Sequence, residues 1–180
     1  ATVLNQNLNN IKGSTIDGLE AEITIAPSDN LTFDIALGWL DGEVENDPTL
    51  ATPLVGLSNT PEQTMNLMAS YVLDTSVGYF VFNANYYYRD DYILFEDSEL
   101  LSQEGYGLLN LGVTWESEGG NWYGGLYAKN LTDEEYMVGG YNFVAVDDDG
   151  NYLPGLGGDT TLASYYGDPQ TYHLSLGYRF

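Results

Sequence analysis

The chain has 180 residues, of which 27 are Asp or Glu and only 4 are Lys or Arg, so its formal net charge is -23. A protein that binds nucleic acid replaces phosphate counterions with its own cations, so this charge balance excludes that class. Cysteine is absent and no run of eighteen apolar residues occurs, which excludes a disulfide framework and a membrane-spanning helix. The 43% of hydrophobic residues exceeds what a highly charged disordered chain carries, so a fold is expected.

Seven segments carry an apolar side chain at every second position, the repeat of a β-strand whose alternate side chains point to opposite faces. In one of them, Phe33 and Ile35 alternate with Asp34 and Ala36. In chain order, the apolar sets begin at Leu19, Leu31, Met65, Phe80, Leu109, Trp122 and Tyr172. Residues 1–7 are expected to hold part of an eighth strand.

The connections between these segments alternate between two classes. Short turns at 27–30, 74–78 and 117–121 are rich in the Gly, Asn, Asp and Ser that suit tight reversals. The other links are long, and they contain 19 of the 27 acidic residues. These links run over residues 41–63, 90–105 and 131–170. Negative charge is therefore expected at one rim of the strands.

Two all-β architectures have alternating strands: a soluble sandwich or barrel, and a membrane barrel whose apolar face points outward. A soluble sandwich carries many mixed charges on its solvent face. Here that face is Gly, Ser, Thr, Asn and Tyr, with almost no Lys. Outer-membrane barrels combine such a lumen with short turns at one end, long loops at the other and aromatic girdles. The sequence therefore predicts antiparallel transmembrane β-barrel strands, about eight, in an up-and-down meander with short periplasmic turns and long extracellular loops.

Several motifs, in their order along the chain, resemble the late barrel strands of TonB-dependent outer-membrane receptors. The motifs are KGSTIDGLEAE (12–22), APSDNLT (26–32), ALGWLD (36–41), LSNTP (57–61), NLMASY (66–71), KNLTDEEY (129–136), GDPQTY (167–172) and the terminal YRF (178–180). The match extends over nearly the whole chain, and it ends in the C-terminal aromatic Phe180. One departure is Gln170, where the family commonly has Arg, so one lumen cation and any ion pair that it would make are absent.

The resemblance implies a barrel of 22 strands, filled by an N-terminal plug that a periplasmic partner pulls. Residues 1–180 are then expected to be the C-terminal third of that barrel, without the plug and the earlier strands. An eight-stranded barrel closed on itself, filled by its own side chains, stays open as an alternative.

The function that the resemblance implies is energy-coupled uptake of a scarce nutrient, such as a siderophore or a saccharide, in the bacterial outer membrane. The loops are expected outside the cell and the C-terminus in the periplasm. The implied partners are membrane lipid, a TonB-type complex acting through the missing plug, the barrel assembly machinery acting on the strand that ends in Phe180, and a small-molecule ligand. The alternative function, for a small barrel, is a membrane anchor, adhesin or loop-display scaffold.

The strand parity places Arg89, Lys129 and Arg179 on the polar face. Two interpretations are open. These cations line a ligand path or contact a plug, or they form structural ion pairs across strands. The candidate ligand or lumen residues are Arg89, Lys129, Tyr87, Tyr127 and Tyr141. Acidic loops repel anions, and tyrosines stack on sugars or flat rings, so neutral or cationic substrates are favoured.

No catalytic residue is expected. His173 and Ser175 lie two residues apart, but neither an orienting acid nor a nucleophile elbow accompanies them. The expectation is therefore a protein that is not an enzyme and needs no organic cofactor. Asp147, Asp148 and Asp149 raise a calcium hypothesis, because hard cations take clustered carboxylate oxygens. A solvated acidic turn is the competing interpretation.

Overall fold

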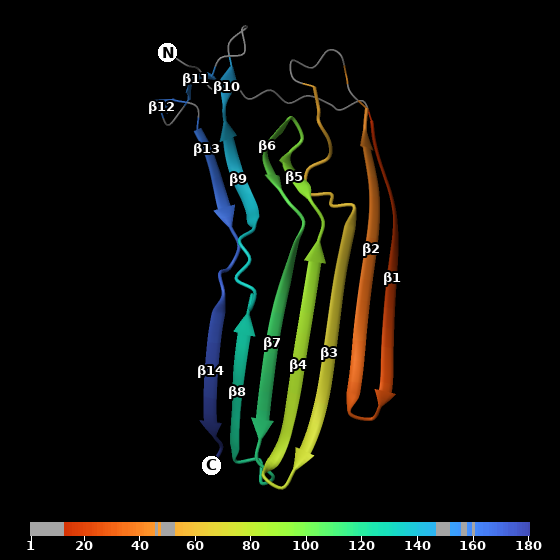
Figure 1. Ribbon diagram of the computed structural model, residues 1–180, viewed down its shortest axis with the longest axis vertical. Helices are drawn as coiled ribbons and strands as arrows, with labels where there is room; N and C mark the ends of the chain where they lie inside the picture. The colour runs from red at the N-terminus through yellow and green to blue at the C-terminus, as the bar shows by residue number, and fades with distance from the viewer. Residues whose placement is uncertain (1–12, 46, 48–52, 147–151, 156–157, 160) are drawn as a thin grey trace.

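The computed structural model describes residues 13–45, 47, 53–146, 152–155, 158–159 and 161–180. Every regular element in these ranges is a β-strand (Figure 1). This part of the chain has no helix that is both long and apolar enough to cross a bilayer. The all-β class expected from the sequence is therefore confirmed.

Seven strands form one antiparallel sheet in the order β1-β2-β3-β4-β7-β8-β14 (Figure 1). Their bounds are Ser14–Ser28 (β1), Leu31–Val44 (β2), Gln63–Thr75 (β3), Gly78–Arg89 (β4), Tyr106–Glu116 (β7), Trp122–Lys129 (β8) and Thr171–Tyr178 (β14). All seven expected strands are present. Strands β1 and β14 lie at opposite edges and do not pair with each other, so the described strands form an open sheet. The expected strand at residues 1–7 falls outside the described ranges.

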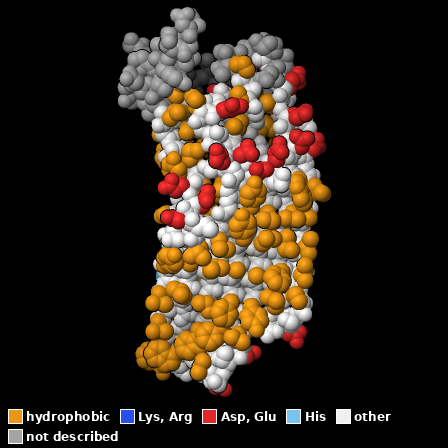
Figure 2. Space-filling view, in the orientation of Figure 1, with side chains coloured by type: hydrophobic (Ala, Val, Ile, Leu, Met, Phe, Trp, Pro, Cys, Tyr) orange, Lys and Arg blue, Asp and Glu red, His pale blue; other side chains and the backbone are white. Residues whose placement is uncertain are grey.

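The register of the sheet brings the apolar positions of all strands onto one face. Ile23 is opposite Ile35, Ile35 opposite Leu67, Leu67 opposite Tyr86, and Tyr86 opposite Leu109. Side chains directly opposite each other in a ladder point to the same face, so these five form one row. We call this side the apolar face and the other the polar face. Figure 2 shows the apolar side chains as a belt over the sheet, with carboxylates gathered toward the long-loop end.

Within the described part of the chain, nothing packs over the apolar face. Leu174 is 76% exposed, Leu176 is 71% exposed and Leu19 is 66% exposed. Among the described residues, the buried hydrophobic side chains are only Tyr92, Leu94, Leu101 and Tyr106. A soluble sandwich would bury the apolar faces of its strands against each other in a shared core. This arrangement therefore contradicts the sandwich and agrees with a face that meets lipid.

The two ends of the sheet differ as expected. At one end, tight turns join β1 to β2, β3 to β4, and β7 to β8 (Figure 1). In the β3–β4 turn, the Thr75 hydroxyl donates to the Gly78 carbonyl at 2.7 Å. Gly78 has φ +121°, and a Cβ there would collide with the Glu116 carbonyl oxygen. This turn position therefore requires glycine.

The long links at the other end contain strands that the sequence did not predict. The extra strands are β5 (Tyr92–Phe95), β6 (Ser98–Gln103), β9 (Met137–Phe143), β10 (Ala145–Val146), β11 (Tyr152–Gly155), β12 (Gly158–Asp159) and β13 (Thr161–Tyr166). β5 pairs with β6, β9 pairs with β13, and β10, β11 and β12 form a small sheet. These strands have two to seven residues, too few for alternation to stand out from a loop.

The face assignment can be tested with two arginine substitutions. Ile35→Arg puts a charge on the apolar face between Ile23 and Leu67, where burial in hydrocarbon costs about 2–4 kcal/mol. Asn83→Arg puts the same charge on the polar face, where Asn83 is exposed. We expect the first variant to lose most of its heat-modifiable, membrane-inserted form and the second to keep it, as measured by gel mobility before and after boiling. Equal assembly of the two variants would contradict the assignment.

Candidate functional site

Asparagine side chains form a hydrogen-bonded row across the polar face. The Asn85 amide on β4 donates to the Asn66 side-chain oxygen on β3. The Asn110 amide on β7 donates to the Asn85 oxygen at 3.2 Å, and the Asn130 backbone N–H donates to the Asn110 oxygen at 2.9 Å. The row thus crosses from β3 to the end of β8. The Asn85 and Asn110 amides each donate and accept in this row, so the row links neighbouring strands without any charge.

A cavity of about 470 Å³ lies over this row of amides. Its lining includes Asn83, Asn85, Asn110, Tyr127, Lys129, Tyr136 and Asp168. Its volume is within the range of small-molecule sites. The lining is rich in amides and tyrosines, with Lys129 as its single cation. Such a surface can bind hydroxyl, carbonyl and aromatic groups, and its charged side chains are one cation, Lys129, and one anion, Asp168.

The turn that follows β8 is organised by Asn130. Its side chain donates to the carbonyls of Glu134 at 2.8 Å and Asp168 at 3.2 Å, and it accepts from the Glu134 N–H at 2.9 Å. Asn130 is only 4% exposed and has φ +48°. Asparagine tolerates this left-handed conformation better than most residues. The KNLTDEEY segment at residues 129–136 is thus a turn in which the buried Asn130 side chain ties the end of β8 to Asp168, just before β14.

Gln170 takes part in the same junction. Its side-chain amide donates to the Leu131 carbonyl at 2.7 Å, and its backbone N–H lies 3.4 Å from an Asp133 carboxylate oxygen. The position that departs from the family pattern is therefore held by hydrogen bonds of its amide and backbone, without a cation.

The one buried apolar cluster of the described residues lies on the polar side of the sheet, at its long-loop end. Tyr92 and Leu94 of β5 and Leu101 of β6 pack with Tyr106, the first residue of β7. The Tyr106 ring stacks on Tyr136 with centroids 4.6 Å apart. We call this cluster the mouth core. The lone hairpin β5–β6 is marginal by itself, so burial of its apolar face is what stabilises it.

The mouth core connects all three long links. The Tyr92 hydroxyl donates to the Met137 carbonyl, and the Met137 N–H donates to the Gln103 side-chain oxygen, both at 2.7 Å. These bonds join the β5–β6 hairpin to β9. On its other side, the Asn59 N–H donates to the Ile93 carbonyl at 2.9 Å, which joins the hairpin to the β2–β3 link. Hydrogen bonds therefore join the described parts of the three links to one another.

Two of the candidate residues contact the mouth core. Tyr87 meets Tyr106 edge to face at 6.4 Å. The Arg89 guanidinium lies 3.9 Å from the centre of the Tyr92 ring and donates to the Asn59 carbonyl at 3.2 Å. Arg89 thus combines a cation–π contact with a bond to the β2–β3 link. Both side chains therefore contact the mouth core, and a role in ligand binding stays a prediction for each.

Two other candidates, Tyr127 and Lys129, line the amide cavity together. The Tyr127 ring faces His173 with centroids 6.1 Å apart. The Ser175 hydroxyl lies 3.4 Å from the Gly125 carbonyl, to which it donates. His173 and Ser175 therefore show no arrangement for acyl transfer.

The last candidate, Tyr141, lies on β9, outside both the mouth core and the amide cavity. Its ring stacks on Phe143 at 5.6 Å and meets Tyr165 edge to face at 5.7 Å. Tyr141 is 52% exposed and Tyr165 is 51% exposed. Desolvation, and then the hydrogen bond with Tyr141, raise the pKa of Tyr165 above its ordinary value. The three rings form an uncharged aromatic surface, which sequence parity could not find because it depends on the β9–β13 pairing.

An ion pair lies at the tight-turn end of the sheet. Arg179 donates to Glu116 at 3.1 Å and to the Gly120 carbonyl at 3.3 Å, and its guanidinium lies 4.4 Å from the centre of the Tyr123 ring. The expectation of structural ion pairs is confirmed for this cation. Among the described residues no three His, Cys, Asp or Glu side chains are grouped to hold a metal ion. Asp147, Asp148 and Asp149 lie outside those residues, so calcium there stays an expectation.

Comparison with known proteins agrees with this geometry. Residues 1–132 match the family described as "TonB dependent receptor-like, beta-barrel". The chain belongs to this family, whose members are receptors and transporters and not enzymes.

Solved structures show the same fold. The ferric yersiniabactin uptake receptor FyuA from Yersinia pestis matches 93% of the chain at 17% identity and a TM-score of 0.71. The siderophore receptor PiuA and the ferric preacinetobactin receptor BauA, both from Acinetobacter baumannii, each match 92%, at 14% and 18% identity and TM-scores of 0.65 and 0.62. The chain covers only 24%, 22% and 22% of the FyuA, PiuA and BauA chains.

The family identifies the two faces of the sheet. Homologous receptors are outer-membrane proteins, and an outer-membrane barrel has an apolar exterior and a polar interior. The apolar face is therefore the lipid-facing wall of the barrel and the polar face lines its lumen. The amide row, the cavity and the mouth core all lie on the lumen side.

Asn130 should be a major contributor to stability. Asn130→Ala removes three buried hydrogen bonds and places a Cβ residue without a polar side chain at φ +48°, so we expect a loss of about 2–4 kcal/mol. Asn130→Gly keeps the backbone conformation and should lose about 1 kcal/mol less. The measurement is the temperature at which the folded band disappears in heat-modifiable gel mobility. Asn83→Ala, exposed on the same face, is the control, and a shift as large as that of Asn130→Ala would refute this role.

The mouth core should control local opening of β9. Tyr92→Phe leaves the Met137 carbonyl without its donor, which should lower the local stability of β9 by about 1 kcal/mol. Because local opening governs amide exchange, exchange at the start of β9 should be about fivefold faster, as measured by hydrogen–deuterium exchange mass spectrometry. Tyr166→Phe removes an exposed hydroxyl from β13 and should leave the rate unchanged. An unchanged exchange rate in Tyr92→Phe would show that the β5–β6 hairpin does not stabilise β9.

Proposed function

We propose that the chain forms the C-terminal part of the barrel of a TonB-dependent receptor that takes up a scarce nutrient by energy-coupled transport. The observation that carries this proposal is the open sheet, with a lipid-facing side, a polar lumen side and two edge strands. A strand edge in hydrocarbon leaves N–H and C=O groups unpaired, and each unpaired group costs several kcal/mol of free energy. Strands β1 and β14 therefore both need a neighbouring strand. The family match and the coverage of about a quarter of solved receptors support many further strands.

The alternative is a complete barrel closed by one strand from residues 1–12. One strand can join two edges only if they are about 10 Å apart, twice the spacing between neighbouring strands. The open sheet instead places β1 and β14 on opposite sides (Figure 1). This favours a fragment of a larger barrel over a small anchor or scaffold.

In the proposed orientation the long links face the outside of the cell and the turns face the periplasm, where the chain ends at Phe180. A plug that precedes these strands would fill the lumen and connect the barrel to a TonB-type complex. The barrel assembly machinery would act on β14. Support for this orientation comes from the general arrangement of outer-membrane barrels, which have short periplasmic turns and longer extracellular loops.

The ligand would bind from the loop side, between the aromatic surface of Tyr141, Phe143 and Tyr165 and the lumen cavity of Tyr127 and Lys129. FyuA and BauA are named for ferric siderophores, which makes a metal chelate one candidate ligand. The mouth of this chain is acidic, however, and such a field repels anions. We therefore propose a neutral or cationic chelate, or a saccharide, as the transported molecule.

The mass and energy dependence of the native protein test this proposal. An antibody raised against the lumen-side and loop residues should detect, in outer membranes, a polypeptide about four times the 19.8 kDa of this chain, because the chain covers 24% of FyuA. Cells that carry it should accumulate its ligand, and a protonophore that dissipates the membrane potential should abolish accumulation. A native polypeptide of 19.8 kDa would overturn the proposal in favour of a small barrel.

A further inference from the structure

The Tyr127 ring lies against the lumen wall, over two glycines. Its register partner on β7 is Gly112, and Gly125 precedes it by two residues on the same face of β8. A Cβ at Gly112 would lie 3.1 Å from Cδ1 of the ring, and a Cβ at Gly125 would lie 2.8 Å from Cε2 and from the hydroxyl oxygen. The ring therefore occupies the space that two side chains would otherwise fill.

This contact makes the ring a platform on the wall. One long edge of the ring covers Gly112 and the other covers Gly125, so the ring lies across the sheet instead of projecting into the lumen. Gly125 is buried, whereas Tyr127 itself is 36% exposed. One face of the ring is therefore open to the cavity of about 470 Å³ that Tyr127 lines. A ring that is already fixed in place loses little entropy when a ligand stacks on it.

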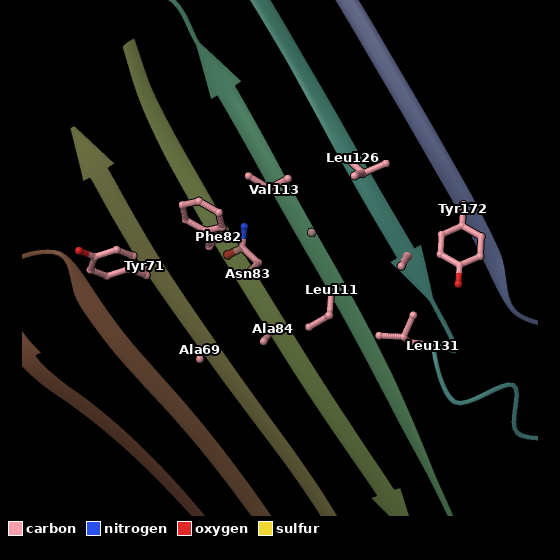
Figure 3. A pocket seen from close by; sticks show the side chains of 12 residues that line it. Ala69, Tyr71, Phe82, Asn83, Ala84, Leu111, Val113, Leu126, Leu131 and Tyr172 are labelled. Carbon is pink, nitrogen blue, oxygen red and sulfur yellow. The ribbon is translucent and has the colours of Figure 1, made fainter. Parts of the chain in front are cut away.

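Two side chains with free hydrogen-bonding groups lie beside the platform. Asn83 is opposite Gly112, in the position next to the ring. Along β4 it lies between Phe82 and Ala84, whose side chains belong to the apolar face (Figure 3). Within the described part of the chain, neither the Asn83 amide nor the Lys129 ammonium group has a hydrogen-bond or ion-pair partner. Both side chains line the same cavity, so their donors are free for a ligand.

The lining of the cavity favours a neutral ligand that is rich in hydroxyl groups. The amides of Asn83 and Asn110 can donate and accept, which matches hydroxyl groups because these also do both. The charged side chains of the lining are Lys129 and Asp168, so the cavity carries no net charge. An anionic chelate would need an excess of cations to form charge-assisted hydrogen bonds. The apolar body of the Tyr127 ring suits the C–H groups on one face of a sugar ring.

We propose that this cavity binds one pyranose ring of a neutral saccharide, stacked on Tyr127 and hydrogen-bonded to Asn83 and Lys129. The inference rests on the proposed function, because it names the transported molecule as a saccharide and Tyr127 as a residue that selects it. Gly112 and Gly125 are positioning residues, since they set the pose of the ring. A sugar ring satisfies the platform and the free donors together, because its C–H groups and its hydroxyl groups point in different directions.

The test uses the full receptor purified from native membranes in a polyoxyethylene detergent, because a glycoside detergent would compete for the site. Binding is screened on an array of neutral mono-, di- and trisaccharides, and the dissociation constant of the tightest one is measured by isothermal titration calorimetry. Tyr127→Leu should weaken this binding about tenfold, the change that about 1.4 kcal/mol of lost stacking produces. Tyr127→Phe keeps the ring and should weaken binding by less than about threefold.

Two glycine variants form a matched pair. Gly125→Ala pushes the Tyr127 ring off the wall and should also weaken binding about tenfold, although the tyrosine is still present. Gly177→Ala displaces the Tyr123 ring in the same way, at the tight-turn end and outside the cavity, and should leave the dissociation constant unchanged. Heat-modifiable gel mobility checks that both variants fold. If Gly125→Ala does not, the comparison of Tyr127→Leu with Tyr127→Phe decides.

Three results would overturn the inference. They are no binding of any neutral saccharide, equal losses in Tyr127→Leu and Tyr127→Phe, and binding only after deletion of the plug, which would assign the platform to the plug. Energy-dependent accumulation of a different solute, unaffected by Tyr127→Leu, would overturn the inference and leave the proposed function standing. Saccharide binding without accumulation that a protonophore abolishes would instead refute transport and leave the site standing.

Discussion

The antiparallel ladder of backbone hydrogen bonds is the constraint on which the rest of this structure depends. Once neighbouring strands are fixed in register, every second side chain points to the same face, and a slip of one residue would reverse a whole strand. Rows such as Ile23–Ile35–Leu67 are continuous because seven strands keep one register. The sheet buries no core of its own, so lipid on one side and the lumen on the other complete it.

The polar side chains of the lumen face are paired mainly without charges. On the lumen side, neutral asparagine side chains hydrogen-bond to one another across strands. Among the described residues, the Arg179–Glu116 ion pair lies at the tight-turn end of the sheet. Neutral amides avoid the large desolvation penalty that buried charges would bring. The chain can therefore carry a net charge of -23 with most of its acids at the loop rim.

The most compact part of the chain is found in its loops. The mouth core joins three long links through Tyr92, Gln103 and Met137, so the loop end behaves as one packed unit. Asn130 similarly fixes the junction of β8 and β14. The aromatic surface around Tyr141 is displayed on this base. Order at the mouth reduces the conformational entropy that these loops would lose when a ligand binds.

The sequence by itself determined the seven strands, their faces, the short turns and the acidic rim, because period-two alternation and turn chemistry are local properties. It also placed Lys129 and Tyr127 on the lumen side. Only the tertiary structure decided that Arg89 and Tyr87 contact the mouth core and that β5, β6, β9 and β13 exist. Each of these depends on which distant residues become neighbours in the sheet, and that pairing is set by register and long-range packing, which no short window of sequence contains.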